Sequence, residues 1–188
     1  QFGAAEKVVS TKELIDKNTL ANLKIKCIVL KHPIKKERMD YAEEMDYLVS
    51  KVSRNNFILD LCNNISGNTL CLFQLVEKHG KILYEGMKER ENVYFVYGGT
   101  DTDQREKIRG LVEGHKNSTT IASYGTFSTG INIRNINNIV LASPSKSKIR
   151  VLQSIGRGLR TSSTKDSILI FDIADDISYK GRRNTSTE

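Results

Sequence analysis

The sequence has 188 residues, of which 38% are hydrophobic and 27% charged, a composition typical of a soluble globular protein rather than a disordered chain. This length supports one domain with a sizeable core, or one domain with an appendage. No apolar run approaches the roughly 18 residues of a membrane-spanning helix. The net charge of +7 permits, but does not prove, binding to a polyanion such as a nucleic acid.

The start of the chain, "QFGAAEKVVS", contains no apolar segment typical of a secretory signal, and it lacks an initiating Met, which favours a fragment of a longer protein. Cys27, Cys62 and Cys71 are odd in number and lie in or beside apolar runs, so they are predicted to be small buried residues with reduced thiols in a cytoplasmic protein. The three histidines have no Cys or His partners at ligand spacing, so we predict no metal site.

The first third of the chain is predicted to be mainly helical. Ser10 and Glu13 form a capping-box pattern, so a short helix is expected there. The segment 25–32 is a candidate strand that could lie at a sheet edge. Residues 35–65 are interpreted as one or two amphipathic helices with a break near Ser53 to Asn56.

From about residue 67, short apolar runs alternate with helical or polar stretches. Helices are expected over 74–88 and 101–115, and a polar loop after residue 123. The predicted strands cover 69–73, 93–97, 119–123, 138–143 and 167–175. Near-continuous apolar strands separated by helices favour an α/β fold with a parallel sheet covered on both faces. The polar residues 176–188 are predicted to form a mobile tail.

The octapeptide "QSIGRGLR" is expected to lie on a helix that follows the run 138–143. Arg157 and Arg160 stand three residues apart and share one helix face, with Gln153 about a turn earlier. Guanidinium groups keep their charge and match phosphate geometry. Gly156 and Gly158 each cost about 1 kcal/mol of helix stability, which makes sense where a ligand or another backbone approaches closely.

This octapeptide resembles motif VI of superfamily-two helicases, and the other motifs of that family follow in order. The stretch "TTIASYGTFSTGINIRNINNIVLAS" is similar to motif V, and "TLCLFQ" is similar to motif IV. The resemblance implies a RecA-like three-layer domain with a mainly parallel central sheet flanked by helices, over 23–175. Residues 1–22 would form an interdomain linker and short helix, and 176–188 would lead toward a missing C-terminus.

The resemblance also implies that the nucleotide lies between two motor domains. The chain contains no G-x-x-x-x-G-K-[ST] loop and no Asp-Glu pair after an apolar strand. ATP and Mg²⁺ would therefore be held mainly by an absent first RecA-like domain, and the chain alone would be inactive. Arg157 and Arg160 would act as arginine fingers, and Gln153 would bind the nucleotide.

Within motif V, the resemblance implies that Thr126 and Ser128 contact the nucleic-acid backbone. Gly130 and Asn132 would face the nucleotide. Many relatives carry Asp at the position of Asn132, so a charge that could couple to the arginines is missing here. The alternative, an ordinary loop capped by hydroxyl groups, stays open on sequence alone.

Two further positions are candidate DNA contacts. In "YGGTDTDQREKI", the glycines permit a tight turn between strand and helix, and the resemblance implies that Gly99 and Thr100 contact a phosphate. Gln74 is a candidate by its place after the 69–73 strand. A loop followed by a helix that Thr100 and Asp103 cap is an equally good interpretation of the stretch 97–108.

The function implied is the C-terminal motor half of an ATP-dependent DNA helicase or translocase. Within the superfamily the chain resembles phage helicases of branched DNA, which implies forks, junctions and R-loops as substrates in recombination and repair. An RNA helicase, a motor that remodels DNA without strand separation, and a non-catalytic basic nucleic-acid-binding module remain alternatives. A small-molecule kinase is disfavoured by the missing phosphate-binding loop.

Overall fold

The computed structural model describes residues 22–33, 39–130, 135–144, 167–179 and 182–185. The strands are β1 (Asn22–Lys31), β2 (Thr69–Phe73), β3 (Val93–Val96), β4 (Thr119–Ser123), β5 (Asn138–Leu141), β6 (Ser167–Tyr179) and β7 (Arg182–Thr185). The helices are α2 (Tyr41–Ser50), α3 (Val52–Asn64), α4 (Lys81–Glu85), α5 (Thr102–Gly114) and α6 (Tyr124–Gly130), with a π-helical turn, η1 (Val76–Gly80).

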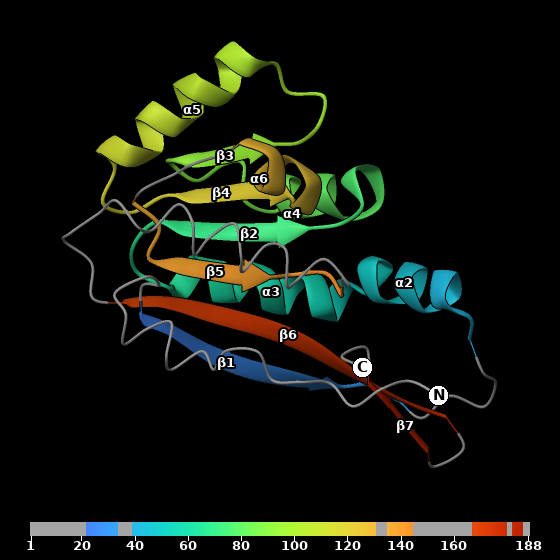
Figure 1. The fold of residues 1–188 in the computed structure, drawn as a ribbon. Helices are drawn as coiled ribbons and strands as arrows, with labels where there is room; N and C mark the ends of the chain where they lie inside the picture. The colour runs from blue at the N-terminus through green and yellow to red at the C-terminus, as the bar shows by residue number, and fades with distance from the viewer. Residues whose placement is uncertain (1–21, 34–38, 131–134, 145–166, 180–181, 186–188) are drawn as a thin grey trace, which may run out of the picture.

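The described strands form one sheet in the order β1-β6-β5-β2-β4-β3, and every neighbouring pair on this path is parallel (Figure 1). β7 runs antiparallel beside β6. The arrangement confirms the predicted α/β class with a mainly parallel sheet. β1 lies at one edge of the path, as its sequence suggests, and β3 lies at the other.

Two hydrophobic layers cover the sheet, one on each face. In β2, Leu70 and Leu72 pack into the layer that includes α5 and α6, whereas Cys71 and Phe73 pack into the layer with α3 and α4. Successive strand residues point to opposite faces, so a strand covered on both sides must be apolar or small throughout. Because a layer covers each face of the sheet, β2, β4 and β5 are buried along their whole length.

The two predicted amphipathic helices are present, but the break lies at Lys51 and not in the predicted stretch 53–56. Lys51 has an extended backbone (φ −73°, ψ 109°), and α3 begins directly after it. The Asn55 side chain donates a hydrogen bond to the Val49 carbonyl at 2.8 Å, which satisfies an acceptor at the end of α2. Polar residues interpreted as a helix break therefore form the first turn of α3.

The predicted helix over 74–88 is present over 76–85, where the π-helical turn η1 runs directly into α4. The π-helical turn carries His79 and Gly80 into the interior, where both are buried. Gly80 lies directly against the Phe73 ring, and a Cβ atom there would come within 2.8 Å of Phe73 Cδ2. The wide turn thus brings this segment close to the end of β2.

The C-terminal part of the described chain contains more strand than expected. The sequence places 176–188 in a polar tail, whereas β6 continues to Tyr179, with Asp176 opposite Thr185 of β7. Main-chain hydrogen bonds to β1 and β7 stabilise the strand conformation of these polar residues. The polarity of the side chains does not indicate this pairing. Among the helices that the structure describes, none is both long and apolar enough to cross a membrane.

Candidate nucleic-acid interface

Three strands that lie side by side end at one edge of the sheet. Parallel pairing places Phe73 of β2 opposite Ser123 of β4, and Val96 of β3 opposite Ala122 of β4. The segments that follow these strands therefore emerge at the same carboxyl edge, where ligands bind in open α/β sheets. Gln74, the Gly98–Thr100 turn and α6 are these segments.

Gln74 is exposed at the end of β2, as expected of a contact residue. Its backbone N–H donates a hydrogen bond to Ser143 Oγ at 3.1 Å, which fixes the main chain across to the end of β5. The exposed side chain at a fixed backbone position is compatible with the predicted contact to a strand of nucleic acid.

The turn after β3 is held by its own hydrogen bonds. The Thr100 N–H donates to the Tyr97 carbonyl at 3.0 Å, and Thr100 Oγ1 accepts from the Tyr97 N–H at 3.1 Å. Arg105 Nη2 donates to the Gly98 carbonyl at 3.0 Å. Thr100 is buried while Gly99 is exposed, so the exposed group available to a phosphate here is the glycine backbone. The Thr100 hydroxyl already serves the turn.

Asp101, not Thr100 or Asp103, caps the following helix. Its side chain accepts a hydrogen bond from the Gln104 N–H at 2.7 Å, and its backbone is extended (φ −67°, ψ 164°). A side-chain acceptor at this position satisfies one of the free N–H groups of the first turn. The expected well-capped helix is therefore present, with the cap moved by one or two residues.

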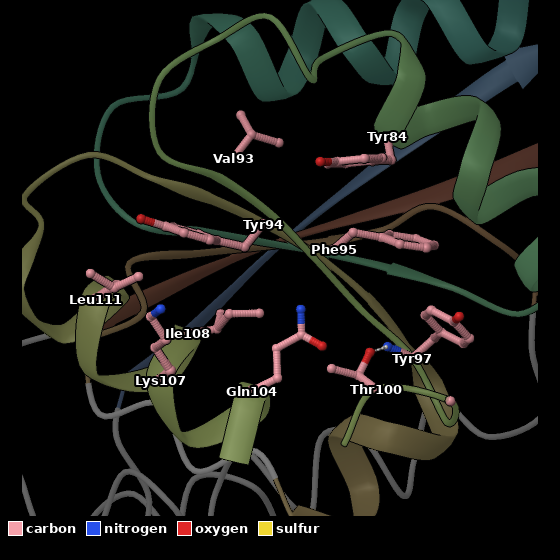
Figure 2. Close-up of a pocket in the computed structure, with 11 residues that line it drawn as sticks. Tyr84, Val93, Tyr94, Phe95, Tyr97, Thr100, Gln104, Lys107, Ile108 and Leu111 are labelled. Carbon is pink, nitrogen blue, oxygen red and sulfur yellow. Dashed lines mark hydrogen bonds between the residues drawn. The ribbon is translucent and has the colours of Figure 1, made fainter. Parts of the chain in front are cut away.

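A cavity of about 520 Å³ opens beside this turn, between α4 and α5 across the edge strand β3 (Figure 2). Tyr84 and Phe95 lie on the α4 side, with ring centroids 5.2 Å apart, and the Phe95 and Tyr97 rings are 5.3 Å apart. Thr100 and Gln104 line the lower part of the cavity in Figure 2. Aromatic side chains thus lie next to the predicted phosphate-contact turn, a feature that the sequence analysis missed.

The predicted polar loop of motif V is a helix. β4 leads directly into α6, and Ser123 Oγ accepts a hydrogen bond from the Thr126 N–H at 3.3 Å, as a helix-capping side chain does. Thr126 Oγ1 lies 2.7 Å from Ser123 Oγ, and Thr126 is only 3% exposed. The Thr126 hydroxyl is therefore turned inward, and the predicted contact of this side chain with nucleic acid is not supported by this arrangement. Ser128 lies in α6 and Gly130 ends it.

Two buried polar clusters at this edge were also missed by the sequence analysis. In the first, Ser143 bonds to Gln74, His79 Nδ1 and Tyr124 Oη. In the second, Asp175 bonds to Arg54 and His32. A carboxylate within an otherwise apolar strand, as in "SILIFDIADD", is the sequence signal that could have indicated the second cluster.

Burial changes the acid–base properties of the first cluster. Loss of hydration, and then the nearby Arg54 charge, lower the pKa of His79 to about 3. The ring is therefore neutral at physiological pH. Burial likewise raises the pKa of Tyr124, whose hydroxyl donates to the Ser143 carbonyl at 2.8 Å. Both side chains act as neutral hydrogen-bonding groups.

The nucleotide-side predictions fall on Asn132, Gln153, Arg157 and Arg160, which lie outside the described residues. Gly130 is the last described residue before that part of motif V. The assignment of these residues to ATP stays a prediction.

The fold and its ordered motifs match a known family. The helicase conserved C-terminal domain family matches residues 50–162, and the chain belongs to this family. The match covers α3 through β5 and extends beyond Arg160. The RecA-like fold predicted from the motifs is thereby confirmed.

Individual relatives include a phage enzyme and a yeast protein. The chain is 36% identical over 187 residues to the ATP-dependent DNA helicase uvsW of enterobacteria phage T4, covering 95% of this chain and 37% of that protein. It is 33% identical over 103 residues to the putative ATP-dependent helicase IRC3 of Saccharomyces cerevisiae, covering 54% of this chain and 15% of that protein.

The crystal structure of T4 UvsW is similar, with a TM-score of 0.70 over 82% of this chain and 33% of that one, at 36% identity. The C-terminal part of the Fun30 ATPase domain matches with a TM-score of 0.56 at 17% identity, over 75% of this chain and 45% of that one, a likeness of fold alone. The chain therefore covers less than half of the length of each of these relatives.

Proposed function

We propose that this chain is the second motor domain of an ATP-dependent DNA helicase or translocase that acts on branched DNA. The observation that carries the proposal is the helicase C-terminal family match over residues 50–162, which includes the octapeptide Gln153–Arg160. The 36% identity to a protein named as an ATP-dependent DNA helicase favours DNA over RNA as the substrate.

ATP and Mg²⁺ are proposed to bind mainly to a first RecA-like domain, with Gln153, Gly130 and Asn132 completing the nucleotide site from this chain. Arg157 and Arg160 would stabilise the charge that develops on the transferred phosphoryl group. ATP binding would close the two domains and hydrolysis would open them, so that the pair steps along one strand.

The nucleic acid is proposed to cross the carboxyl edge of the sheet. Gln74 and Gly99 are exposed there, after β2 and β3, the two strands that flank β4, which supports contacts to a sugar-phosphate backbone. Ser128 is kept as a proposed contact, whereas Thr100 and Thr126 have hydroxyl groups engaged within the protein. Backbone contacts of this kind carry little sequence information, as a motor that moves along DNA requires.

The arginine roles are tested in the protein that combines this chain with its first motor domain. Arg157→Ala or Arg160→Ala should lower DNA-stimulated ATP hydrolysis by about 10³-fold to 10⁵-fold. Arg109→Ala is a matched control that should leave the rate unchanged, because Arg109 forms partly exposed ion pairs with Glu106 and Glu113 on its own helix α5. ATP hydrolysis at the unaltered rate in both arginine variants would remove the assignment.

The substrate is tested by strand-separation assays with forked DNA, four-way junctions, R-loops and duplex RNA of matched length. Preferential unwinding of the branched DNA supports the proposal, and preference for duplex RNA would instead identify an RNA helicase. Nucleic-acid binding with no nucleotide dependence would favour a non-catalytic binding module. The 188-residue chain by itself should not hydrolyse ATP.

A further inference from the structure

A buried serine, through its hydroxyl and its backbone carbonyl, joins three segments of the candidate nucleic-acid interface. Ser143, two residues after the end of β5, accepts a hydrogen bond from the Gln74 N–H on its Oγ at 3.1 Å. The same Oγ lies 2.8 Å from His79 Nδ1. The Ser143 carbonyl accepts from the Tyr124 hydroxyl at 2.8 Å. We call Ser143, His79, Tyr124 and the backbone N–H of Gln74 the Ser143 cluster.

The members of the Ser143 cluster come from different strand ends of the sheet. Gln74 follows β2, Tyr124 opens α6 after β4, and Ser143 follows β5, while His79 lies in η1. These strands are neighbours in the order β5-β2-β4. One serine therefore links the end of β5 to the segments that follow β2 and β4.

The side chains of the Ser143 cluster are buried, whereas Gln74, whose backbone they hold in place, is exposed. Ser143 and His79 are 0% exposed and Tyr124 is 3% exposed, but the Gln74 side chain faces solvent. Hydrogen bonds shielded from water keep their geometry because water does not compete for the partners. Ser143 is thus suited to fix the backbone from which Gln74 projects, together with the start of α6.

The chemistry of the partners explains why a serine and a histidine are used. A hydroxyl has one proton and two lone pairs, so it can accept from the Gln74 N–H and still bond to a ring nitrogen. A neutral imidazole forms that bond in either tautomer. An apolar residue at position 143 would leave the Gln74 N–H and His79 Nδ1 without this partner, which is costly at a buried site.

From this geometry we propose that Ser143 and His79 are positioning residues for the nucleic-acid contacts of this domain. They act through Gln74 and α6 and do not themselves touch the strand. The inference rests on the proposed function, because the spacing of Gln74 and α6 matters only if both lie along one bound backbone. If the protein already holds these contact groups at the required spacing, binding of the strand costs less conformational entropy.

The test uses the complete protein with its first motor domain and compares Ser143→Ala with Thr120→Val. Thr120 in β4 is 1% exposed, and its Oγ1 has no hydrogen-bond partner among the described residues. Both changes remove one buried hydroxyl, but only the first removes a link between segments. Ser143→Ala should raise the single-stranded DNA concentration for half-maximal ATPase stimulation by about tenfold, with the maximal rate retained. Thr120→Val should leave both values unchanged.

A second measurement reports the mechanism without using activity. Amide hydrogen exchange of the peptide that contains Gln74 should become about tenfold faster in Ser143→Ala, while exchange in β4 stays as in the parent protein. Tyr124→Phe, which removes only the bond to the Ser143 carbonyl, is the second variant if Ser143→Ala does not fold. Its expected effects are faster exchange at the start of α6 and weaker DNA stimulation.

The outcomes separate this inference from the proposed function. If the parent protein is stimulated by DNA and both Ser143→Ala and Tyr124→Phe retain its DNA dependence, the positioning role is wrong and the motor function stands. If Thr120→Val weakens DNA stimulation as much as Ser143→Ala does, the effect is general destabilisation and the inference is overturned. A parent protein that DNA does not stimulate would contradict the proposed function and, with it, this inference.

Discussion

Arg54 and Asp175 form a doubly hydrogen-bonded ion pair inside the protein, although they lie 121 residues apart in the sequence. Arg54 Nε is 2.9 Å from Asp175 Oδ1, and Arg54 Nη2 is 2.9 Å from Asp175 Oδ2. Arg54 Nη2 also donates to the Ala142 carbonyl at 2.8 Å, and His32 Nε2 lies 2.8 Å from Asp175 Oδ1. The pair therefore connects α3, β5, β6 and the end of β1 at the carboxyl edge of the sheet.

Removing one member of this pair should strongly destabilise the fold. Asp175→Ala would leave the Arg54 charge buried without its partner, which costs about 3–5 kcal/mol in the free energy of unfolding. Urea titration followed by circular dichroism measures this change. Asp46→Ala, which breaks the exposed pair with Lys78, should change stability little. An Asp175→Ala loss no greater than that of Asp46→Ala would contradict the prediction.

His79 should make the protein less stable in acid. Its pKa is about 3 in the folded state, below the value of about 6.5 for an unfolded chain. Between these values the unfolded state binds a proton that the folded state does not, so stability falls as pH decreases, by up to about 1.4 kcal/mol per pH unit. Unfolding free energies at pH 7, 6 and 5 should fall less steeply in His79→Phe than in the parent. Parallel curves for the two proteins would show that His79 is not responsible.

Alanine substitutions at two glycines in helical segments should have opposite effects on stability. A methyl group at Gly80 would overlap the Phe73 ring, so Gly80→Ala should destabilise the protein by about 1–3 kcal/mol. Gly110 lies in the exposed part of α5, and a Cβ atom there would meet open space. Gly110→Ala should therefore stabilise the protein by about 0.5–1 kcal/mol. Melting temperatures of both variants test the pair, and a Gly80→Ala protein as stable as Gly110→Ala would contradict the packing argument.

The three cysteines should differ sharply in reactivity. The prediction that all three are buried is confirmed for Cys62 and Cys71 but is wrong for Cys27, which is exposed on the edge strand β1. A hydrogen bond with Cys62, followed by burial, raises the pKa of Cys71, which further lowers its thiolate fraction. Iodoacetamide at neutral pH should therefore modify Cys27 in the native protein, with the other two reacting only after denaturation. Peptide mass spectrometry identifies the sites, and equal labelling of Cys71 and Cys27 in the folded state would overturn this expectation.

The sheet could be predicted from sequence because its central strands have a local signature. The run Thr119–Ser123 is predicted with its observed bounds, since a strand buried on both faces must be small or apolar throughout. The end of β6 could not be found in this way. Asp176 and Ser178 are polar residues whose strand conformation depends on pairing with β1 and β7.

The candidate site was predictable in position but not in detail. Placing Gln74 and Gly99 at one edge requires only the order of strands and turns. Hydroxyl groups at Thr100 and Thr126 indicated ligand contacts, yet both are used to hold a local turn or helix start. The Ser143–His79 bond joins residues 64 positions apart, and no local periodicity encodes such a contact.

The pairing of β1 with β6 has a consequence for how the domain acquires its structure. Asn22 lies opposite Ser167 and Lys31 opposite Asp176, so the earliest described strand has no sheet partner until residues 167–176 have been made. The block β5-β2-β4-β3 can form from residues 69–141 alone. Such long-range closure slows folding and leaves an open strand edge in the interval. During synthesis, β1 therefore stays unpaired until β6 has been made, after the residues of β5, β2, β4 and β3 are complete.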